Sequence, residues 1–138
     1  MVLTLEADYA VRIVDELAQS KRKIDAKTLS EHTRVPLRFA LKILRKLVAS
    51  GVIVSYKGAH GGYMLASPAE EITLRQVIES VEGPYMLSRC QQNSYSCTHD
   101  TCCRFHEIYD EISLIVRNKL ESYTFGAVEC KSDHSGKS

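Results

Sequence analysis

The chain has 138 residues and a formal net charge of +1, and 44% of its residues are hydrophobic and 25% charged. This size and composition suit one soluble domain with a buried core and an appended helix. No apolar run approaches the roughly 20 residues of a membrane span. Glu6 and Asp8 interrupt the apolar stretch that a signal peptide would need. We therefore expect a cytoplasmic protein that has no membrane partner.

Three helices are predicted in the N-terminal third of the chain. Residues 5–17 carry an apolar stripe at helical spacing, and Asp25 is placed to cap a second helix over residues 26–32. After a short turn, Pro36 suits the first position of a third helix, because its missing N–H is not needed there. Gly51 ends that third helix. The second and third helices together form a helix-turn-helix.

A β-hairpin is predicted directly after the third helix. Residues 52–56 are rich in β-branched side chains, and residues 63–66 return as the second strand. The glycine-rich stretch 57–62 forms the turn between them. Because a helix-turn-helix followed by a hairpin is a winged helix, we assign residues 1–83 to a winged helix-turn-helix DNA-binding domain. The predicted fold class is therefore mostly α, with a small β-hairpin wing.

The remainder of the chain is predicted to form a loop, a long helix and a tail. Thr73 caps a fourth helix that stops at Gly83, and residues 84–103 have no clear periodicity and form a cysteine-bearing loop. Residues 104–128 contain a long helix whose narrow apolar seam is typical of dimerisation, with packing on its own domain as the alternative. Residues 129–138 are expected to be a disordered tail. The seam consists of Phe105, Ile108, Ile112 and Ile115.

The charges of the chain are unevenly distributed. No Asp or Glu lies between Glu31 and Glu70, and we call this stretch the acid-free segment. It covers the third helix and the wing, so it predicts a local positive patch for an anionic partner such as DNA. A solvated basic face with nothing bound is the alternative. The basic residues of the segment are Arg34, Arg38, Lys42, Arg45, Lys46 and Lys57.

The third helix is predicted to read DNA. An α-helix turns by about 100° per residue, and on this basis the cations of the third helix lie within an arc of about 100° around its axis. We expect its apolar residues to pack on the first two helices; these are Leu37, Leu41, Leu44, Leu47 and Val48. In a major groove, residues near the N-terminus of a helix reach base edges, and other cations reach phosphates. The predicted contacts are Arg38, Phe39 and Lys42 for bases, Arg45 and Lys46 for phosphates, Lys57 and Gly58 in the wing, and Pro36 at the start of the helix.

The five cysteines are an odd number, and in a reducing compartment they indicate metal binding or thiol chemistry rather than structural disulfides. Cys90, Cys97 and Cys103 precede His106, and three thiolates with a histidine form a set of soft metal ligands. The spacing leaves zinc, an iron–sulfur cluster and unligated redox thiols as alternatives. Nothing resembles an oxyanion hole or a substrate pocket, so we expect no enzyme with Cys103 as its nucleophile.

Several short motifs precede and flank this cysteine loop: Leu3-Thr4, Asp8-Tyr9-Ala10, Lys57-Gly58, Gly61-Gly62-Tyr63, Ile72-Thr73-Leu74, Val77-Ile78 and Val81-Glu82-Gly83. Together with the loop they make the chain resemble the IscR and NsrR family of winged-helix regulators, from Met1 to about Val128. The resemblance implies a homodimeric repressor whose operator affinity is set by an iron–sulfur cluster that senses redox state, nitric oxide or iron–sulfur supply. A cluster-free regulator controlled by a metabolite or a partner protein is the alternative.

The resemblance also implies a set of cluster ligands. Three of them are Cys90, Cys97 and Cys103. If the chain follows the IscR type, His106 is the fourth ligand and the cluster is 2Fe–2S. If it follows the NsrR type, the fourth ligand is Asp8 of the partner subunit and the cluster is 4Fe–4S. Cys102 is the rival of Cys103 for the third position.

Two residues in the reading elements depart from the pattern of the family. Leu41 stands where IscR-type relatives carry a glutamate that tunes the choice of site, so we do not expect switching between two classes of site. His60 replaces a usual wing glycine. We add His60 to the predicted DNA contacts because its side chain can reach a phosphate.

Overall fold

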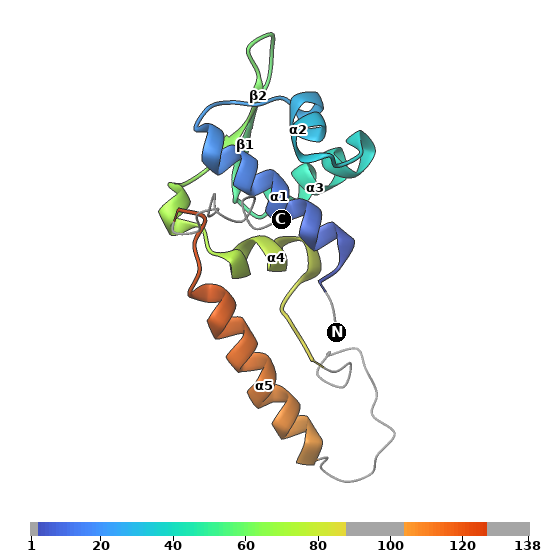
Figure 1. Cartoon of the computed structure of the whole chain (residues 1–138), viewed down its shortest axis with the longest axis vertical. Coiled ribbons are helices and arrows are strands. Elements are labelled where there is room, and N and C mark those ends of the chain that lie inside the picture. The colour runs from blue at the N-terminus through green and yellow to red at the C-terminus, as the bar shows by residue number, and fades with distance from the viewer. Residues whose placement is uncertain (1–2, 88–103, 127–138) are drawn as a thin grey trace, which may run out of the picture.

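The computed structural model describes residues 3–87 and 104–126. Its first three helices are α1 (Leu5–Ser20), α2 (Ala26–Thr33) and α3 (Leu37–Ala49). The Thr4 hydroxyl caps α1 by accepting a hydrogen bond from the Ala7 N–H at 3.1 Å. Lys21 ends α1 in the left-handed conformation, with a φ of 56°. The three helices pack on one another in the upper part of the molecule (Figure 1).

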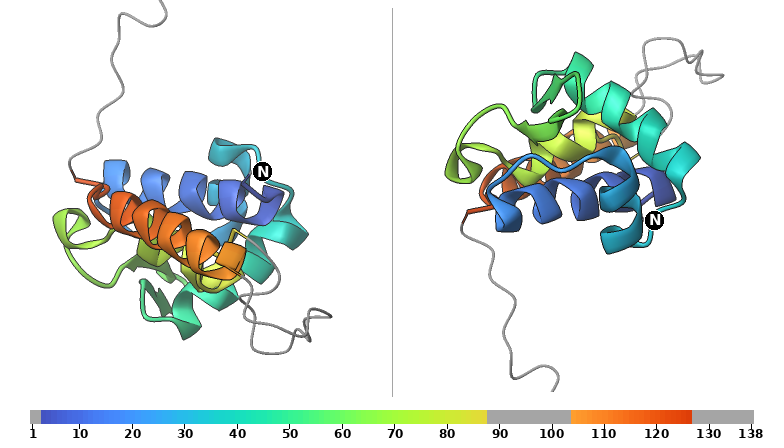
Figure 2. Two further views of the ribbon diagram at one scale, coloured as in Figure 1. Left: turned by 90° about the horizontal axis from the view of Figure 1, so that it is seen from below. Right: turned by 90° about the horizontal axis from the view of Figure 1, so that it is seen from above.

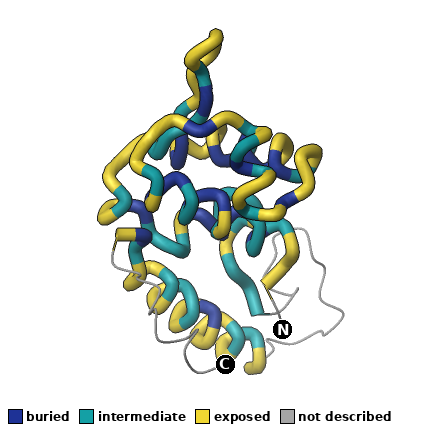
Figure 3. Tube along the Cα trace, turned by 45° about the horizontal axis from the view of Figure 1, so that its top comes forward, coloured by how far each residue is buried: buried dark blue, intermediate teal, exposed yellow. Residues whose placement is uncertain are grey.

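The wing is an antiparallel hairpin of β1 (Ile53–Tyr56) and β2 (Gly62–Leu65). The connector between α1 and α2 adds a short third pairing, because Ile24 and Tyr63 exchange backbone hydrogen bonds of 3.1 and 2.8 Å. Gly62 permits this close approach. Its φ is +150°, and a Cβ at this position would lie 3.0 Å from the Ile24 backbone. The hairpin projects from the domain, and its tip is exposed (Figure 3).

Two further helices complete the described chain. A 3₁₀ turn, η1 (Ala69–Glu71), leads into α4 (Leu74–Glu82), and the last helix is α5 (Arg104–Glu121). The Thr73 hydroxyl caps α4 by accepting a hydrogen bond from the Gln76 N–H at 3.0 Å. Helix α5 contacts α4 and extends away from the rest of the domain (Figure 1), and in the view from below it lies in front of the other helices (Figure 2).

One apolar core joins helices α1 to α4, the base of the wing and the segment after α5. That segment returns to the domain, where the Leu74 N–H donates to the Tyr123 carbonyl at 2.9 Å and the Phe125 N–H donates to the Ile72 carbonyl at 3.1 Å. The Phe125 side chain is only 6% exposed and belongs to the core. Figure 3 shows burial concentrated in the centre of the domain, whereas α5 is largely exposed.

The predicted mostly α fold with a β-hairpin wing and a long C-terminal helix is confirmed. The predicted boundaries differ from the observed ones by one to three residues, and two of the differences have a clear cause. Helix α1 continues past Leu17 to Ser20, because Ala18 is buried in the core. Pro36 is the N-cap of α3 rather than its first residue, since its ψ of 138° is extended while its carbonyl accepts from the Ala40 N–H at 2.9 Å. No helix in the two described ranges is apolar over the length that a membrane crossing requires.

Candidate nucleic-acid interface and cluster ligands

Helix α3 has a buried side and an exposed side. Its fully buried residues are Ala40, Ile43, Leu44 and Leu47. These side chains fix α3 against α1 and α2. Arg38, Lys42 and Arg45 lie on the exposed side, so the amphipathic pattern places the predicted cations where a partner can reach them.

Three apolar side chains share that exposed side. Leu37 is 44% exposed, Leu41 is 42% exposed and Val48 is 36% exposed. The expectation that they pack on the first two helices is therefore wrong. The reason is geometric: the buried side of α3 is a strip that Ala40, Ile43, Leu44 and Leu47 already fill. The other apolar positions are rotated out of contact with α1 and α2.

Two of the α3 cations pair with an acidic residue of α1. The Glu6 carboxylate lies 3.1 Å from Lys42 Nζ and 2.5 Å from Lys46 Nζ. The hydrogen bond from Lys46, supported by Lys42, holds the pKa of the Glu6 carboxyl below its ordinary value, so Glu6 is ionised at neutral pH. Within the described ranges, Arg38 and Arg45 are the α3 cations that have no carboxylate partner.

Phe39, in the first turn of α3, contacts α1. Its ring centroid lies 6.1 Å from that of Tyr9, and it packs against the core. The Arg38 guanidinium lies 5.0 Å from the Phe39 centroid, within range of a cation–π contact. Phe39 therefore supports Arg38 and the packing of α1 on α3. Its own predicted contact with a base stays a prediction.

The predicted wing contacts lie at the exposed tip of the hairpin. Lys57, Gly58 and His60 are all exposed. Gly58 has a φ of +100°, and its carbonyl accepts a hydrogen bond from the Gly61 N–H at 3.0 Å, which closes the turn. A turn of this kind brings backbone close to a partner without side-chain obstruction. The contacts of these residues with DNA stay predictions.

Cations of the connector between α1 and α2 lie beside the wing, and sequence reasoning missed them. Lys23 Nζ lies 4.9 Å from the centroid of the Tyr56 ring. Arg22 and Lys23 line a groove of about 600 Å³ together with residues of both wing strands. The basic run Lys21-Arg22-Lys23 is the pattern that identifies them, but it lies outside the acid-free segment.

Both residues predicted as rival fourth ligands are described. His106 is in the first turn of α5, and its Nε2 lies 3.3 Å from the Asp110 carboxylate. Asp8 is in the first turn of α1, and its carboxylate lies 2.8 Å from Arg12. The predicted thiol positions, Cys90, Cys97, Cys102 and Cys103, lie outside the described residues. Among the residues that are described, no group of three His, Cys, Asp or Glu side chains gathers for a metal.

The predicted seam of α5 faces outward in the single chain. Its members, Phe105, Ile108, Ile112 and Ile115, are between 37% and 60% exposed. The side of α5 that meets the domain carries Ser113, which is fully buried and accepts a hydrogen bond from the Leu87 N–H at 3.0 Å. Within residues 3–87 and 104–126, the seam therefore does not pack on its own domain.

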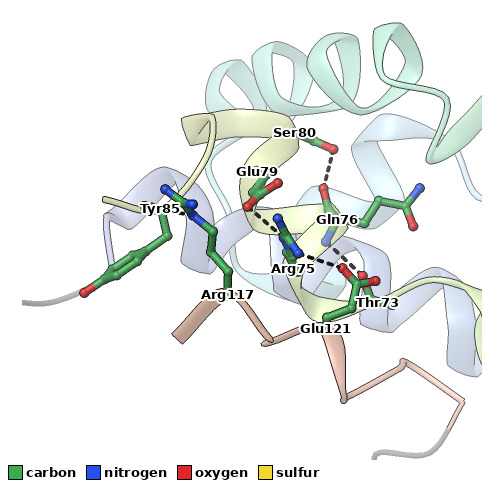
Figure 4. A network of polar contacts seen from close by, with 8 residues as sticks. All are labelled: Thr73, Arg75, Gln76, Glu79, Ser80, Tyr85, Arg117 and Glu121. Atoms are coloured by element: carbon green, nitrogen blue, oxygen red, sulfur yellow. Dashed lines mark hydrogen bonds and ion pairs between the residues drawn. The ribbon is translucent and has the colours of Figure 1, made fainter. Parts of the chain in front are cut away.

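Polar contacts fasten α5 to α4 and its following turn (Figure 4). Arg75 lies 3.0 Å from Glu79 of its own helix and 3.4 Å from Glu121 at the end of α5. Arg117 donates from Nε to the Tyr85 carbonyl at 2.8 Å. These contacts hold α5 in an orientation that leaves its apolar seam exposed.

Comparison with known proteins identifies a family for this chain, which combines a basic α3, a wing and a C-terminal helix. A family model named Rrf2, described as an iron-dependent transcriptional regulator, matches residues 3–129. The chain belongs to the Rrf2 family. It is 30% identical to the regulator NsrR of Shouchella clausii over 127 residues, which cover 90% of this chain and 85% of the relative.

Other Rrf2-type proteins agree with this assignment. The chain is 28% identical to the regulator IscR of Vibrio vulnificus over 136 residues, which cover 97% of this chain and 79% of the relative. The structure of CymR, the global cysteine regulator of B. subtilis, matches with a TM-score of 0.73 at 23% identity and shares the fold, with 91% of this chain and 94% of CymR covered. The predicted family is confirmed, and the Rrf2 chain is a DNA-binding transcriptional regulator rather than an enzyme.

Proposed function

We propose that this Rrf2 regulator is a cytoplasmic homodimeric repressor whose affinity for its DNA operator depends on a bound iron–sulfur cluster. The observation that carries the DNA-binding part is the exposed side of α3. Arg38 and Arg45 lie there without a carboxylate partner in the described ranges, and the wing tip with Lys57 belongs to the same acid-free segment. A helix with this charge fits a major groove, and the wing supplies contacts beside it.

We assign the proposed roles to three successive segments of the chain. Residues 1–83 read the operator, and residues 84–103 with His106 hold the cluster. Residues 104–128 bring two copies together through the α5 seam. An exposed apolar seam of this length supports pairing with a second α5, because water contact with four large apolar side chains is unfavourable. A dimer also presents two copies of α3, as recognition of two half-sites requires.

The donor set fits an iron–sulfur cluster. Thiolates from Cys90, Cys97 and Cys103 are the ligands that iron–sulfur clusters prefer. His106 follows this segment directly, and the carboxylate of Asp110 beside its Nε2 resembles the partners that orient ligating histidines. We favour His106 as the fourth ligand because it lies three residues after Cys103, and Asp8 of the partner subunit is its rival. A bound cluster supplies a group that responds to redox state, nitric oxide or iron–sulfur supply.

Iron and sulfide content after anaerobic reconstitution tests the ligand set. We expect Cys97→Ala and His106→Ala to lose most of the cluster that the wild type holds, and Asp8→Ala to retain it. The reverse behaviour of His106→Ala and Asp8→Ala would assign the fourth position to Asp8. A wild-type protein that takes up no iron and sulfide would support the cluster-free alternative.

The salt dependence of DNA affinity tests the proposed interface. Each phosphate contact contributes about 0.9 to the slope of log affinity against log salt. We expect Arg45→Ala to weaken binding to all sequences and to reduce this slope by about 1. Lys137→Ala, outside both the DNA-binding residues 1–83 and the α5 seam, is the charge-matched control, and it should leave affinity and slope unchanged. Equal effects of the two variants would contradict the placement of DNA on α3.

A further inference from the structure

The exposed side of α3 carries an apolar row that folding does not explain. Leu37, Leu41 and Val48 lie within an arc of about 40° at 100° per residue, and all three are at least 36% exposed. A single exposed leucine is ordinary in a protein surface. Three apolar side chains aligned on a helix that already buries a separate strip are not needed for the core. We call these three residues the apolar row.

The surroundings of the apolar row are cationic. Arg38 and Arg45 border the row on the same exposed side of α3, and the row lies inside the acid-free segment. A second copy of α3 placed on this surface would bring like charges together, which is unfavourable. The matching partner therefore offers negative charge and small apolar groups at once. A DNA major groove does so, because phosphates line it and the C5-methyl group of thymine projects into it.

We infer that Leu37 and Leu41 contact thymine methyl groups in the major groove and give the operator a requirement for thymine at those positions. This inference rests on the proposed DNA-binding function. The two leucines are one turn apart and separated by about 6 Å along the axis of α3, which is close to two base steps of about 3.4 Å. Both lie toward the N-terminal half of α3, from which side chains reach base edges.

Replacement of thymine by uracil isolates the contact, because it removes only the C5-methyl group. Operator duplexes are first selected from random sequences by the wild-type protein, and each thymine of a half-site is then replaced in turn. For the wild type we expect at least one replacement to weaken binding by about 3- to 5-fold, the effect of burying one methyl-sized group. At the position where uracil weakens binding of the wild type, either Leu41→Ala or Leu37→Ala should bind the thymine duplex and the uracil duplex with equal affinity.

Leu5→Ala is the matched control, because it removes a similarly exposed leucine that lies outside α3. This variant should keep the wild-type preference for thymine, and thermal unfolding should show that all three variants are folded. If the uracil penalty persists unchanged in both α3 variants, the inference is overturned while DNA binding stands. A change of oligomeric state in Leu41→Ala would also overturn it, because the row would then join two chains. If no sequence is enriched at all, the proposed function itself fails.

Discussion

Glu6 pairs with two cations on the proposed DNA-binding side of α3, and we expect Glu6→Gln to tighten DNA binding. The Glu6 carboxylate pairs with Lys42 at 3.1 Å and with Lys46 at 2.5 Å. Glutamine keeps the size of the side chain and removes its charge. The ammonium group of Lys42 can then reach base edges and that of Lys46 a phosphate, and the repulsion between Glu6 and the DNA backbone disappears.

The expected gain in DNA affinity follows from the solvent exposure of the two ion pairs that Glu6 forms. The side chains of Lys42 and Lys46 are 54% and 38% exposed, so water screens each pair and its contribution is about 0.5 kcal/mol. Two pairs together contribute about 1 kcal/mol, so the affinity for DNA should rise by about 5-fold. The slope of log affinity against log salt should steepen by about 1, because one phosphate contact is gained.

The same pairs stabilise the fold in a pH-dependent way. The folded-state pKa of Glu6 is lowered, chiefly by Lys46, so its contribution to the free energy of unfolding is present above the unfolded pKa. It is lost as the pH falls through the folded pKa. Glu6→Gln should therefore lower the free energy of unfolding by about 1 kcal/mol at neutral pH. Below the folded pKa of Glu6, the variant and the wild type should be equally stable.

Fluorescence anisotropy of a labelled operator, measured between about 50 and about 200 mM salt, provides the assay. Glu111→Gln on α5 is the control, because it changes the net charge by the same amount away from α3. We expect tighter binding for Glu6→Gln alone. If both variants bind DNA more tightly by the same factor, the effect comes from the change in net charge. If Glu6→Gln does not gain at all, the lysines are not part of the DNA-binding side.

Three further predictions test the fold and the assembly. Phe125→Ala should lower the free energy of unfolding by about 3 kcal/mol, because Phe125 is buried in the core, whereas the exposed Tyr123→Ala should cost under about 1 kcal/mol in the same chemical denaturation. Gly62→Ala should destabilise the protein by about 1–3 kcal/mol through its contact with the connector backbone, and Gly58→Ala by less, because its Cβ meets open space. Ile115→Lys should convert the proposed dimer to a monomer in analytical ultracentrifugation; a dimer that persists would exclude the seam from the interface.

Local chemistry made much of the fold predictable. The apolar stripe of α1, the capping hydroxyl of Thr73 and the glycine-rich turn of the wing each act within a few residues, so the sequence displays them directly. The cations on the exposed side of α3 were predictable for the same reason. Helical periodicity places Arg38, Lys42 and Arg45 together without knowledge of the neighbouring helices.

Features that depend on distant partners were not predictable. The burial of Phe125 arises from backbone pairing with Ile72, far away in the sequence. The pairing of Glu6 with Lys42 and Lys46 likewise needs α1 and α3 to be packed together. The exposure of Leu41 shows the limit of apolar patterns, because the width of the buried strip on a helix is set by its neighbours and not by its own composition.

The operator affinity of one anaerobic preparation, measured before and after removal of the cluster, tests the proposed switch most directly. We predict that the two forms of the wild type differ by about 5- to 150-fold, the range of typical allosteric coupling. Cys97→Ala should show the cluster-free affinity under both conditions. Equal affinities of the two wild-type forms, or an unchanged difference in Cys97→Ala, would contradict control of DNA binding by a cluster at these cysteines.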